Sequence, residues 1–244
     1  MLTAENLYVQ GRHSDLLAPT SLVARPGEVL LVRADDASSR TALALALSGR
    51  MKPTSGSLAW NRDAHGGHLR RRSALVDSPG VNEPELHLRV KDLVAEDLAL
   101  IPRAQRPRTS PSRWLEARGM GGSADLWMEQ VPASDRIRLL TALALADSRI
   151  DLLVLDSPDR HQGNPAAWLS SVEDAVAAAA ADALTVIAVV AQLPPEWSGP
   201  AAQEGNAAAP ADVPVEPEDE SDAPAPGGAG APATAEPAET EVTA

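Results

Sequence analysis

Residues 34–41, which read Ala-Asp-Asp-Ala-Ser-Ser-Arg-Thr, follow the short apolar run Glu28–Arg33. A loop that leads from a buried strand into a helix can bind phosphate, because the first backbone N–H groups of a helix are free and the helix dipole favours an anion. The full phosphate-binding template is Gly-x4-Gly-Lys-Ser/Thr, and in this loop only Thr41 matches it strictly. The spacing therefore indicates a candidate phosphate loop, and an ordinary loop between a strand and a helix is the alternative.

Short apolar runs alternate with stretches of helix-forming residues along the first 195 residues. Strands are expected at residues 2–9, 20–24, 28–33, 57–60, 74–76, 152–155 and 185–190, where apolar and β-branched residues lie between turn signals. Helices are expected at residues 41–48, 90–100, 114–118, 134–146 and 168–183. This alternation predicts an α/β protein with a mostly parallel sheet that is covered on both faces and has antiparallel strands at its N-terminus.

The net charge of the 244-residue chain is −13, and it is unevenly distributed. The 11 acidic and no basic residues from Glu196 onward account for −11, so residues 1–195 carry only −2. Ten of the 21 prolines also lie between Pro194 and Pro237. We therefore expect one domain at residues 1–195 and a disordered acidic, Pro- and Ala-rich tail at residues 196–244, because such a composition buries too little apolar surface to fold.

The composition excludes several classes of protein. The chain has no cysteine, which excludes disulfides, a thiol nucleophile and a thiolate metal site. Its longest apolar run, Leu184–Ala191, is too short to cross a bilayer, and its N-terminus has no signal-peptide pattern. The nearly neutral body argues against nucleic acid as a partner. A cytoplasmic protein is expected.

Several longer segments follow one another in an informative order. PGEVLLV at residues 26–32 leads into the candidate loop, and LSGRMKPTSGSLAW at residues 47–60 follows it. DRIRLLTALALA at residues 135–146 precedes IDLLVLDSP at residues 150–158, and TVIAVVAQ at residues 185–192 comes last. This order resembles that of ATP-binding-cassette (ABC) nucleotide-binding domains over about residues 1–193. The resemblance implies a P-loop NTPase-like fold with a helical subdomain, which is reduced in this chain.

The same resemblance implies a site for ATP and Mg²⁺. Ser38, Ser39, Arg40 and Thr41 would line the phosphate loop, and Asp156 would lie opposite them at the end of the Walker B strand. Thr41 and Asp156 align with the hydroxyl and the carboxylate that this family places beside magnesium. Any ATP would therefore be held by Arg40, Thr41 and Asp156.

Most other functional positions of the family carry different residues, so no catalytic residue is assigned. Arg40 replaces the phosphate-binding lysine, and a planar guanidinium is not interchangeable with an ammonium. The catalytic glutamate, the switch histidine and the signature loop align with Ser157, Ala191 and residues 131–135. Asp35 adds negative charge beside the phosphate position. The loop glycines, which let phosphate approach the backbone closely, are replaced by Ala34, Ala37 and Ser39.

These substitutions favour a transporter-associated ABC nucleotide-binding subunit whose catalysis is lost or impaired. Such a subunit would act as a structural or regulatory partner of a membrane protein, and it would form a homodimer or a heterodimer. One alternative is an active ABC ATPase in which Arg40 takes the role of the lysine and a partner supplies the base. Another is an interaction module derived from a P-loop protein, without a transporter, that binds through its tail.

Two further groups of residues are open to more than one interpretation. His65 and His68 have helical spacing, but the two glycines between them indicate a solvated loop, and no carboxylate pair nearby supports a metal site. Residues 70–72 are three consecutive arginines. A solvated face explains them best, with lipid headgroups, an acidic partner or the acidic tail as alternatives, and the arginines between residues 103 and 113 leave similar alternatives open.

Overall fold

The computed structural model describes residues 1–161, 164, 166–179 and 184–207. Its strands are β1 (Leu2–Gln10), β2 (Asp15–Ala24), β3 (Val29–Arg33), β4 (Ser55–Trp60), β5 (Ser73–Val76), β6 (Leu152–Asp156), β7 (Thr185–Val190) and β8 (Ala201–Gln203). Its α-helices are α1 (Ala37–Leu47), α2 (Gly66–Arg72), α3 (Val90–Leu100), α4 (Pro111–Glu116), α5 (Ala133–Ala144) and α6 (Leu169–Ala178). Short 3-10 helices are η1 (Gly121–Ser123), η2 (Met128–Gln130) and η3 (Pro158–Arg160).

The strands form two sheets. The central sheet has the order β5-β6-β7-β3-β8, and all its pairs are parallel. The second sheet has the order β2-β1-β4 and is antiparallel. The predicted α/β fold, with a mostly parallel sheet and antiparallel N-terminal strands, is confirmed.

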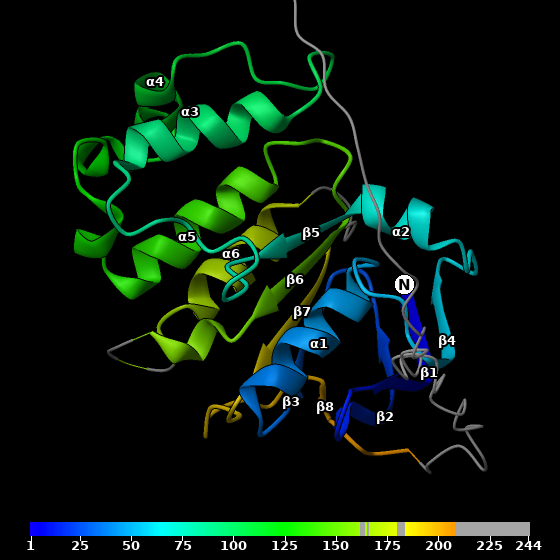
Figure 1. Ribbon diagram of the computed structural model, residues 1–244. Coiled ribbons are helices and arrows are strands. Elements are labelled where there is room, and N and C mark those ends of the chain that lie inside the picture. The colour runs from blue at the N-terminus through cyan, green and yellow to red at the C-terminus, as the bar shows by residue number, and fades with distance from the viewer. Residues whose placement is uncertain (162–163, 165, 180–183, 208–244) are drawn as a thin grey trace, which may run out of the picture. The chain divides into compact units, whose positions relative to one another are not determined.

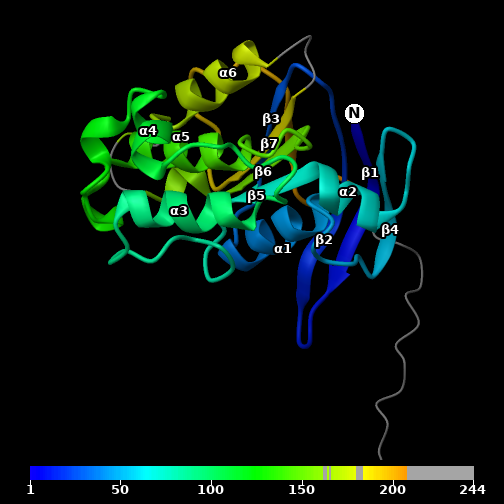
Figure 2. The ribbon, with the colours of Figure 1, turned by 90° about the horizontal axis from the view of Figure 1, so that it is seen from above.

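The central sheet separates two hydrophobic clusters. Successive strand residues point to opposite faces, so Leu152 and Val154 of β6 pack in the cluster that contains α1 and the antiparallel sheet. Leu153 and Leu155 pack in the cluster that contains α3, α5 and α6. Figure 2 shows α1 on one side of the central strands and α6 on the other. Because both faces are covered, polar residues reach a common site mainly where the strands end.

The helices between β5 and β6 form a region of their own. Figure 1 shows α3 and α4 stacked beyond α5. Trp114 of α4 and Ile137 of α5 are 1% and 0% exposed and belong to the same cluster as one face of the sheet. Within the described part of the chain, every helix is too short or too polar to cross a bilayer.

Helix α1 begins four residues earlier than the sequence predicts. The predicted start is Thr41, whereas the structure starts the helix at Ala37 with Asp36 as its extended N-cap (φ −82°, ψ 137°). Aspartate is a favoured residue at this position, although the Asp36 side chain makes no capping hydrogen bond. The connection from β3 to α1 is therefore reduced to residues 34–36.

Helix α2 occupies a segment that the sequence predicts as a loop. Oδ1 of Asp63 accepts a hydrogen bond from the backbone N–H of His65 at 2.9 Å, and the Nδ1 atoms of His65 and His68 each lie 2.8 Å from an Asp63 oxygen. Leu69 is 1% exposed and packs in the cluster with α1. These contacts outweigh the two glycines, each of which costs about 1 kcal/mol relative to alanine.

The fold continues past the boundary predicted at residue 195. β8 pairs in parallel with β3 along its three residues. Just beyond it, Oδ1 of Asn206 accepts a hydrogen bond from the N–H of Ser21 in β2 at 2.8 Å. Residues 196–207 are therefore part of the same unit as the sheets. The remainder of the predicted tail, from residue 208, lies outside the described residues.

Candidate functional site

Buried polar residues gather at the carboxyl ends of the central strands. Asp77 follows β5, Asp156 ends β6 and Ser157 follows it. These three residues are 2%, 0% and 3% exposed. Because neighbouring parallel strands end at the same edge of a sheet, the loop after β3 lies near the same edge, and together they form the candidate site.

Asp156 accepts hydrogen bonds from three hydroxyl groups. Thr41 Oγ1 and Ser78 Oγ each donate to Oδ2 at 2.7 Å, and Ser157 Oγ donates to Oδ1 at 2.9 Å. The contact between Thr41 and Asp156 spans 115 residues of sequence and ties α1 to β6. The structure thus brings together the two residues that the resemblance assigns to magnesium.

Thr41 and Asp156 supply oxygen donors of the type that Mg²⁺ binds. Magnesium is usually held by one or two carboxylates and completes its octahedral shell with waters and phosphate oxygens. The described residues contain no group of three or more His, Asp or Glu side chains that could hold a metal ion. The donor set therefore fits Mg²⁺ only together with a phosphate ligand, and the assignment stays a prediction.

Arg40, in the first turns of α1, directs its guanidinium back onto its own loop. Nη1 donates to the carbonyl oxygens of Ala34 at 2.9 Å and Asp35 at 2.7 Å. Nε donates to Ser157 Oγ at 2.8 Å. The side chain therefore links α1, the loop after β3 and the end of β6. Among the described residues these bonds use Nε and Nη1, so the two N–H groups of Nη2 are the donors that Arg40 still offers to a ligand.

The loop after β3 lacks the backbone conformations that glycine permits in a phosphate loop. Ser38 and Ser39 lie inside α1, where Ser38 is exposed and Ser39 is 7% exposed. No residue of the segment 34–41 has the positive φ that glycine permits, and the alanine and serine Cβ atoms fill space beside the backbone. The Asp35 carboxylate is bonded to Arg33 at 2.9 Å. Binding of the ATP phosphates at this loop stays a prediction.

Asp77 lies at the end of β5 in a cluster of charged partners. Arg136 Nη2 of α5 and Arg160 Nη2 each lie 3.0 Å from Oδ1, and His161 Nε2 lies 2.6 Å from Oδ2. Burial alone would raise the pKa of Asp77, but the hydrogen bonds from His161 and Arg136 and the charge of Arg160 lower it to about 2. This cluster joins α5 and η3 to β5.

No protein-family model and no curated protein sequence matches this chain. Solved structures do match it. An ABC transporter ATP-binding protein from Pyrococcus furiosus aligns with a TM-score of 0.59 and 14% identity over 83% of this chain and 96% of its own. The protein cbiO1 from Clostridium perfringens, part of the ABC transporter complex cbiONQ, aligns with a TM-score of 0.57 and 14% identity over 78% of both chains. A dimeric bacterial ABC transporter cassette aligns with a TM-score of 0.57 and 17% identity over 79% of this chain and 88% of its own.

This chain has the fold of an ABC transporter ATP-binding cassette. The positions that align with the water-activating groups of the family hold no base. Ser157, at the glutamate position, has φ 51°, and its hydroxyl donates to Asp156 while it accepts from Arg40. Ala191, at the switch position, has only a methyl side chain, and its N–H donates to Asp159 Oδ2 at 2.9 Å. Neither residue can take a proton from an attacking water.

The segment at the signature position of the cassette enters α5 through Pro132. This proline is the N-cap of the helix (φ −54°, ψ 148°) and has no N–H to donate. Arg136, one turn further along α5, is committed to Asp77. In the family, the signature offers N–H and O–H groups to a partner's nucleotide, and the residues here offer fewer of them.

The sequence pointed to Thr41 and Asp156. It did not identify the other residues that surround Asp156, nor those that surround Asp77. A signal was present at Arg136, because an arginine on the buried face of a helix requires a buried partner. The missed residues are Ser78, Arg136, Arg160 and His161, together with the role of Asp77 as their acceptor.

Proposed function

We propose that this chain is a cytoplasmic cassette-fold subunit that does not turn over ATP and acts as a structural or regulatory partner of a membrane protein. The observation that carries the proposal is the arrangement of Arg40, whose guanidinium is bonded to Ala34, Asp35 and Ser157. The residue at the lysine position thus links α1 to the loop after β3 and to the end of β6.

Two further observations support the loss of turnover. A hydrogen bond that involves a charged group is worth about 1.5–3 kcal/mol, so the bonds of Nε and Nη1 hold the Arg40 side chain on its own loop and leave only Nη2 for a phosphate. Even with nucleotide bound, the positions of Ser157 and Ala191 supply no general base. Weak binding of Mg-ATP is therefore compatible with the proposal, whereas hydrolysis is not.

Calorimetry with Mg-ATP and a phosphate-release assay on the full chain test this proposal. We expect no phosphate release above that of the Asp156→Asn variant. We also expect the Arg40→Lys variant to bind Mg-ATP more tightly than the natural chain, because an ammonium cannot span the three acceptors and is freer to meet a phosphate. Arg12→Lys, which changes an exposed arginine between β1 and β2, is the matched control.

Phosphate release that is lost in both the Arg40→Ala and the Asp156→Asn variants would contradict the proposal. That result would favour the alternative of an active ATPase in which Arg40 replaces the lysine.

The membrane partner is proposed from the fold, because a structurally similar protein is part of a transporter complex. Cross-linking in intact cells, followed by identification of the linked proteins, tests this part. We expect a membrane-spanning protein linked to the body of the chain, and a dimer of cassettes if the chain assembles as its structural neighbour does. Cross-links to water-soluble proteins alone would favour an interaction module without a transporter.

A further inference from the structure

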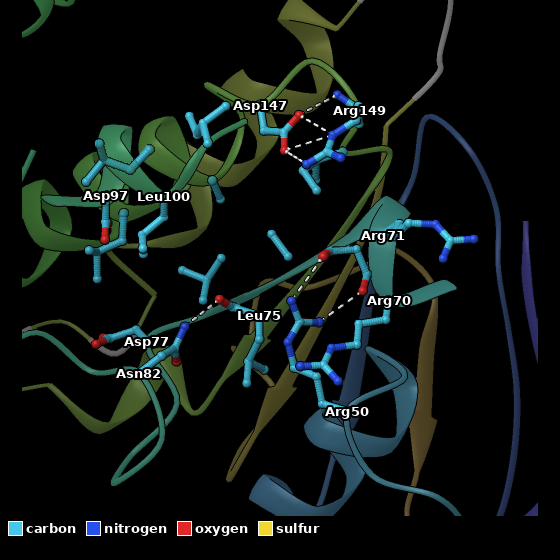
Figure 3. Close-up of a pocket in the computed structure, with 18 of the residues that line it drawn as sticks. Arg50, Arg70, Arg71, Leu75, Asp77, Asn82, Asp97, Leu100, Asp147 and Arg149 are labelled. Atoms are coloured by element: carbon cyan, nitrogen blue, oxygen red, sulfur yellow. Dashed lines mark hydrogen bonds and ion pairs between the residues drawn. The ribbon is translucent and has the colours of Figure 1, made fainter. Parts of the chain in front are cut away.

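A cavity of about 630 Å³ lies among α2, β5, α3 and α5, and its lining includes none of Arg40, Thr41 and Asp156. Its two sides differ in character. Arg50, which follows α1, and Arg70 of α2 lie on one side, and Leu100 of α3 lies across from them (Figure 3). The volume falls within the range of about 300–1,000 Å³ that is typical of small-molecule sites.

Within the described part of the chain, the guanidinium of Arg50 has only neutral partners. Nη1 donates to the carbonyl oxygen of Ser48 and to Ser73 Oγ, both at 3.0 Å, and Nη2 donates to the carbonyl oxygen of Ser73 at 3.1 Å. Burial and the neighbouring charge of Arg70 lower the pKa of Arg50. Among the described residues, no carboxylate oxygen lies within 4.0 Å of the guanidinium of Arg50 or Arg70. Two like charges therefore lie close together without a counterion from the described chain.

The carboxylates that line the cavity do not neutralise this pair. Asp147 is bonded to Arg149, with Oδ2 2.6 Å from Nη2. Asp77 belongs to the charged cluster at the end of β5. Asp97 lies beside Leu100, across the cavity from Arg50 and Arg70 (Figure 3). The arginine side of the cavity therefore keeps its positive potential.

Apart from Asp97, the other side of the cavity is lined by apolar residues. Leu140 and Leu143 of α5 line it together with Ile101, and these three residues are buried. Leu100, at the rim, is 82% exposed, the largest exposure among the large apolar residues of the described chain. A ligand with an apolar part would cover this side chain and remove its surface from water.

We propose that this cavity binds a phosphate group that is attached to a small apolar body. The guanidiniums of Arg50 and Arg70 would meet the phosphate through charge-assisted hydrogen bonds, which a planar guanidinium forms in pairs. The apolar body would lie along α3 and α5 against Leu100. The site is independent of the ATP position, since its lining excludes the residues of the phosphate loop.

Titration of the full chain with mono-octyl phosphate and with inorganic phosphate tests the proposal by calorimetry. We expect mono-octyl phosphate to bind more tightly than inorganic phosphate. Arg70→Ala should weaken both about tenfold, the usual scale for one lost charge-assisted hydrogen bond. Arg70 is chosen because it is exposed, so its replacement does not threaten the fold as that of Arg50 would.

A second variant tests the apolar side separately. Leu100→Ser should weaken mono-octyl phosphate several-fold and leave inorganic phosphate unchanged, because only the apolar body contacts this residue. Arg12→Ala is the control and should bind as the natural chain does. Arg40→Ala tests separately whether the anion lies in the phosphate loop instead.

Three results would overturn the proposal. The first is that mono-octyl phosphate does not bind, and the second is that Arg70→Ala leaves its binding unchanged. The third is that Arg40→Ala removes the binding, because this result would place the anion in the phosphate loop. Co-sedimentation with phosphatidylcholine vesicles that contain phosphatidic acid distinguishes the source of the phosphate. If the chain sediments with these vesicles and Arg70→Ala does not, the phosphate belongs to a lipid headgroup. If the chain binds mono-octyl phosphate but does not sediment with the vesicles, the ligand is a free phosphate ester.

Discussion

Asp77 and Asp156 end neighbouring strands of one sheet, and both are almost fully buried, yet their partners differ. Three neutral hydroxyls donate to Asp156, whereas two guanidiniums and an imidazole surround Asp77. A hydroxyl can turn to donate or to accept, but a guanidinium only donates. The surroundings of Asp156 can therefore adapt to a change of charge, whereas those of Asp77 depend on its negative charge.

The comparison also shows how the chain connects its own elements at the ends of the central strands. The hydroxyl cluster joins α1 to β6 through Thr41, and the charged cluster joins α5 to β5 through Arg136. Arg40 adds a third connection between α1 and the end of β6. The carboxylates of Asp77 and Asp156 thus have hydrogen-bond partners within the chain itself.

The largest expected effect is that of Asp77→Asn. The substitution removes the charge that faces Arg136, which is 5% exposed, and breaking a buried ion pair in this way costs about 3–5 kcal/mol. Urea denaturation measures the free energy of unfolding. Asp63→Asn is the control, because Asp63 also has a pKa of about 2 but lies at the surface, so its loss should matter much less. Equal losses of unfolding free energy in the two variants would show that burial is not the reason why the Asp77 cluster stabilises the fold.

A smaller effect is expected from pH. The pKa of Asp77 is lowered from its ordinary value of 3.8 to about 2, so its ionised form stabilises the folded chain fully above about pH 4. This stabilisation, about 2 kcal/mol, is lost as pH falls toward the folded-state pKa. The free energy of unfolding should therefore fall more steeply between about pH 4 and about pH 2 in the natural chain than in Asp77→Asn. Parallel curves for the two proteins would contradict this prediction.

The smallest effect is expected from Asp156→Asn. An amide keeps one acceptor oxygen, and a neighbouring hydroxyl can rotate to accept from the new NH₂ group. The loss of stability should be about 1 kcal/mol, well below that of Asp77→Asn in the same urea measurement. A loss as large as that of Asp77→Asn would mean that the hydroxyls cannot reorient, and the contrast between the two sites would disappear.

The order of strands and helices was predictable because it depends on local patterns. Residues 152–155 and 185–190 are apolar runs of the kind that buried parallel strands require, and both form central strands. The short elements were not predictable. Helix α2 depends on Asp63 and on the burial of Leu69, and β8 exists only because it pairs with β3.

The candidate site was predictable only in part, and for a similar reason. Thr41 and Asp156 could be paired because each lies in a recognisable segment of an ordered series. Asp77 could not be paired with Arg136 or His161, which lie 59 and 84 residues away, because that contact depends on how α5 and η3 pack against β5.

The amino-acid sequence by itself determined which chemical groups are present: an arginine at residue 40, a serine at residue 157 and an alanine at residue 191. Only the tertiary structure decided what these groups do. A hydrogen bond forms over about 3 Å and in a narrow range of directions, so the partners of Arg40, Asp77 and Asp156 depend on the packing that brings distant segments together.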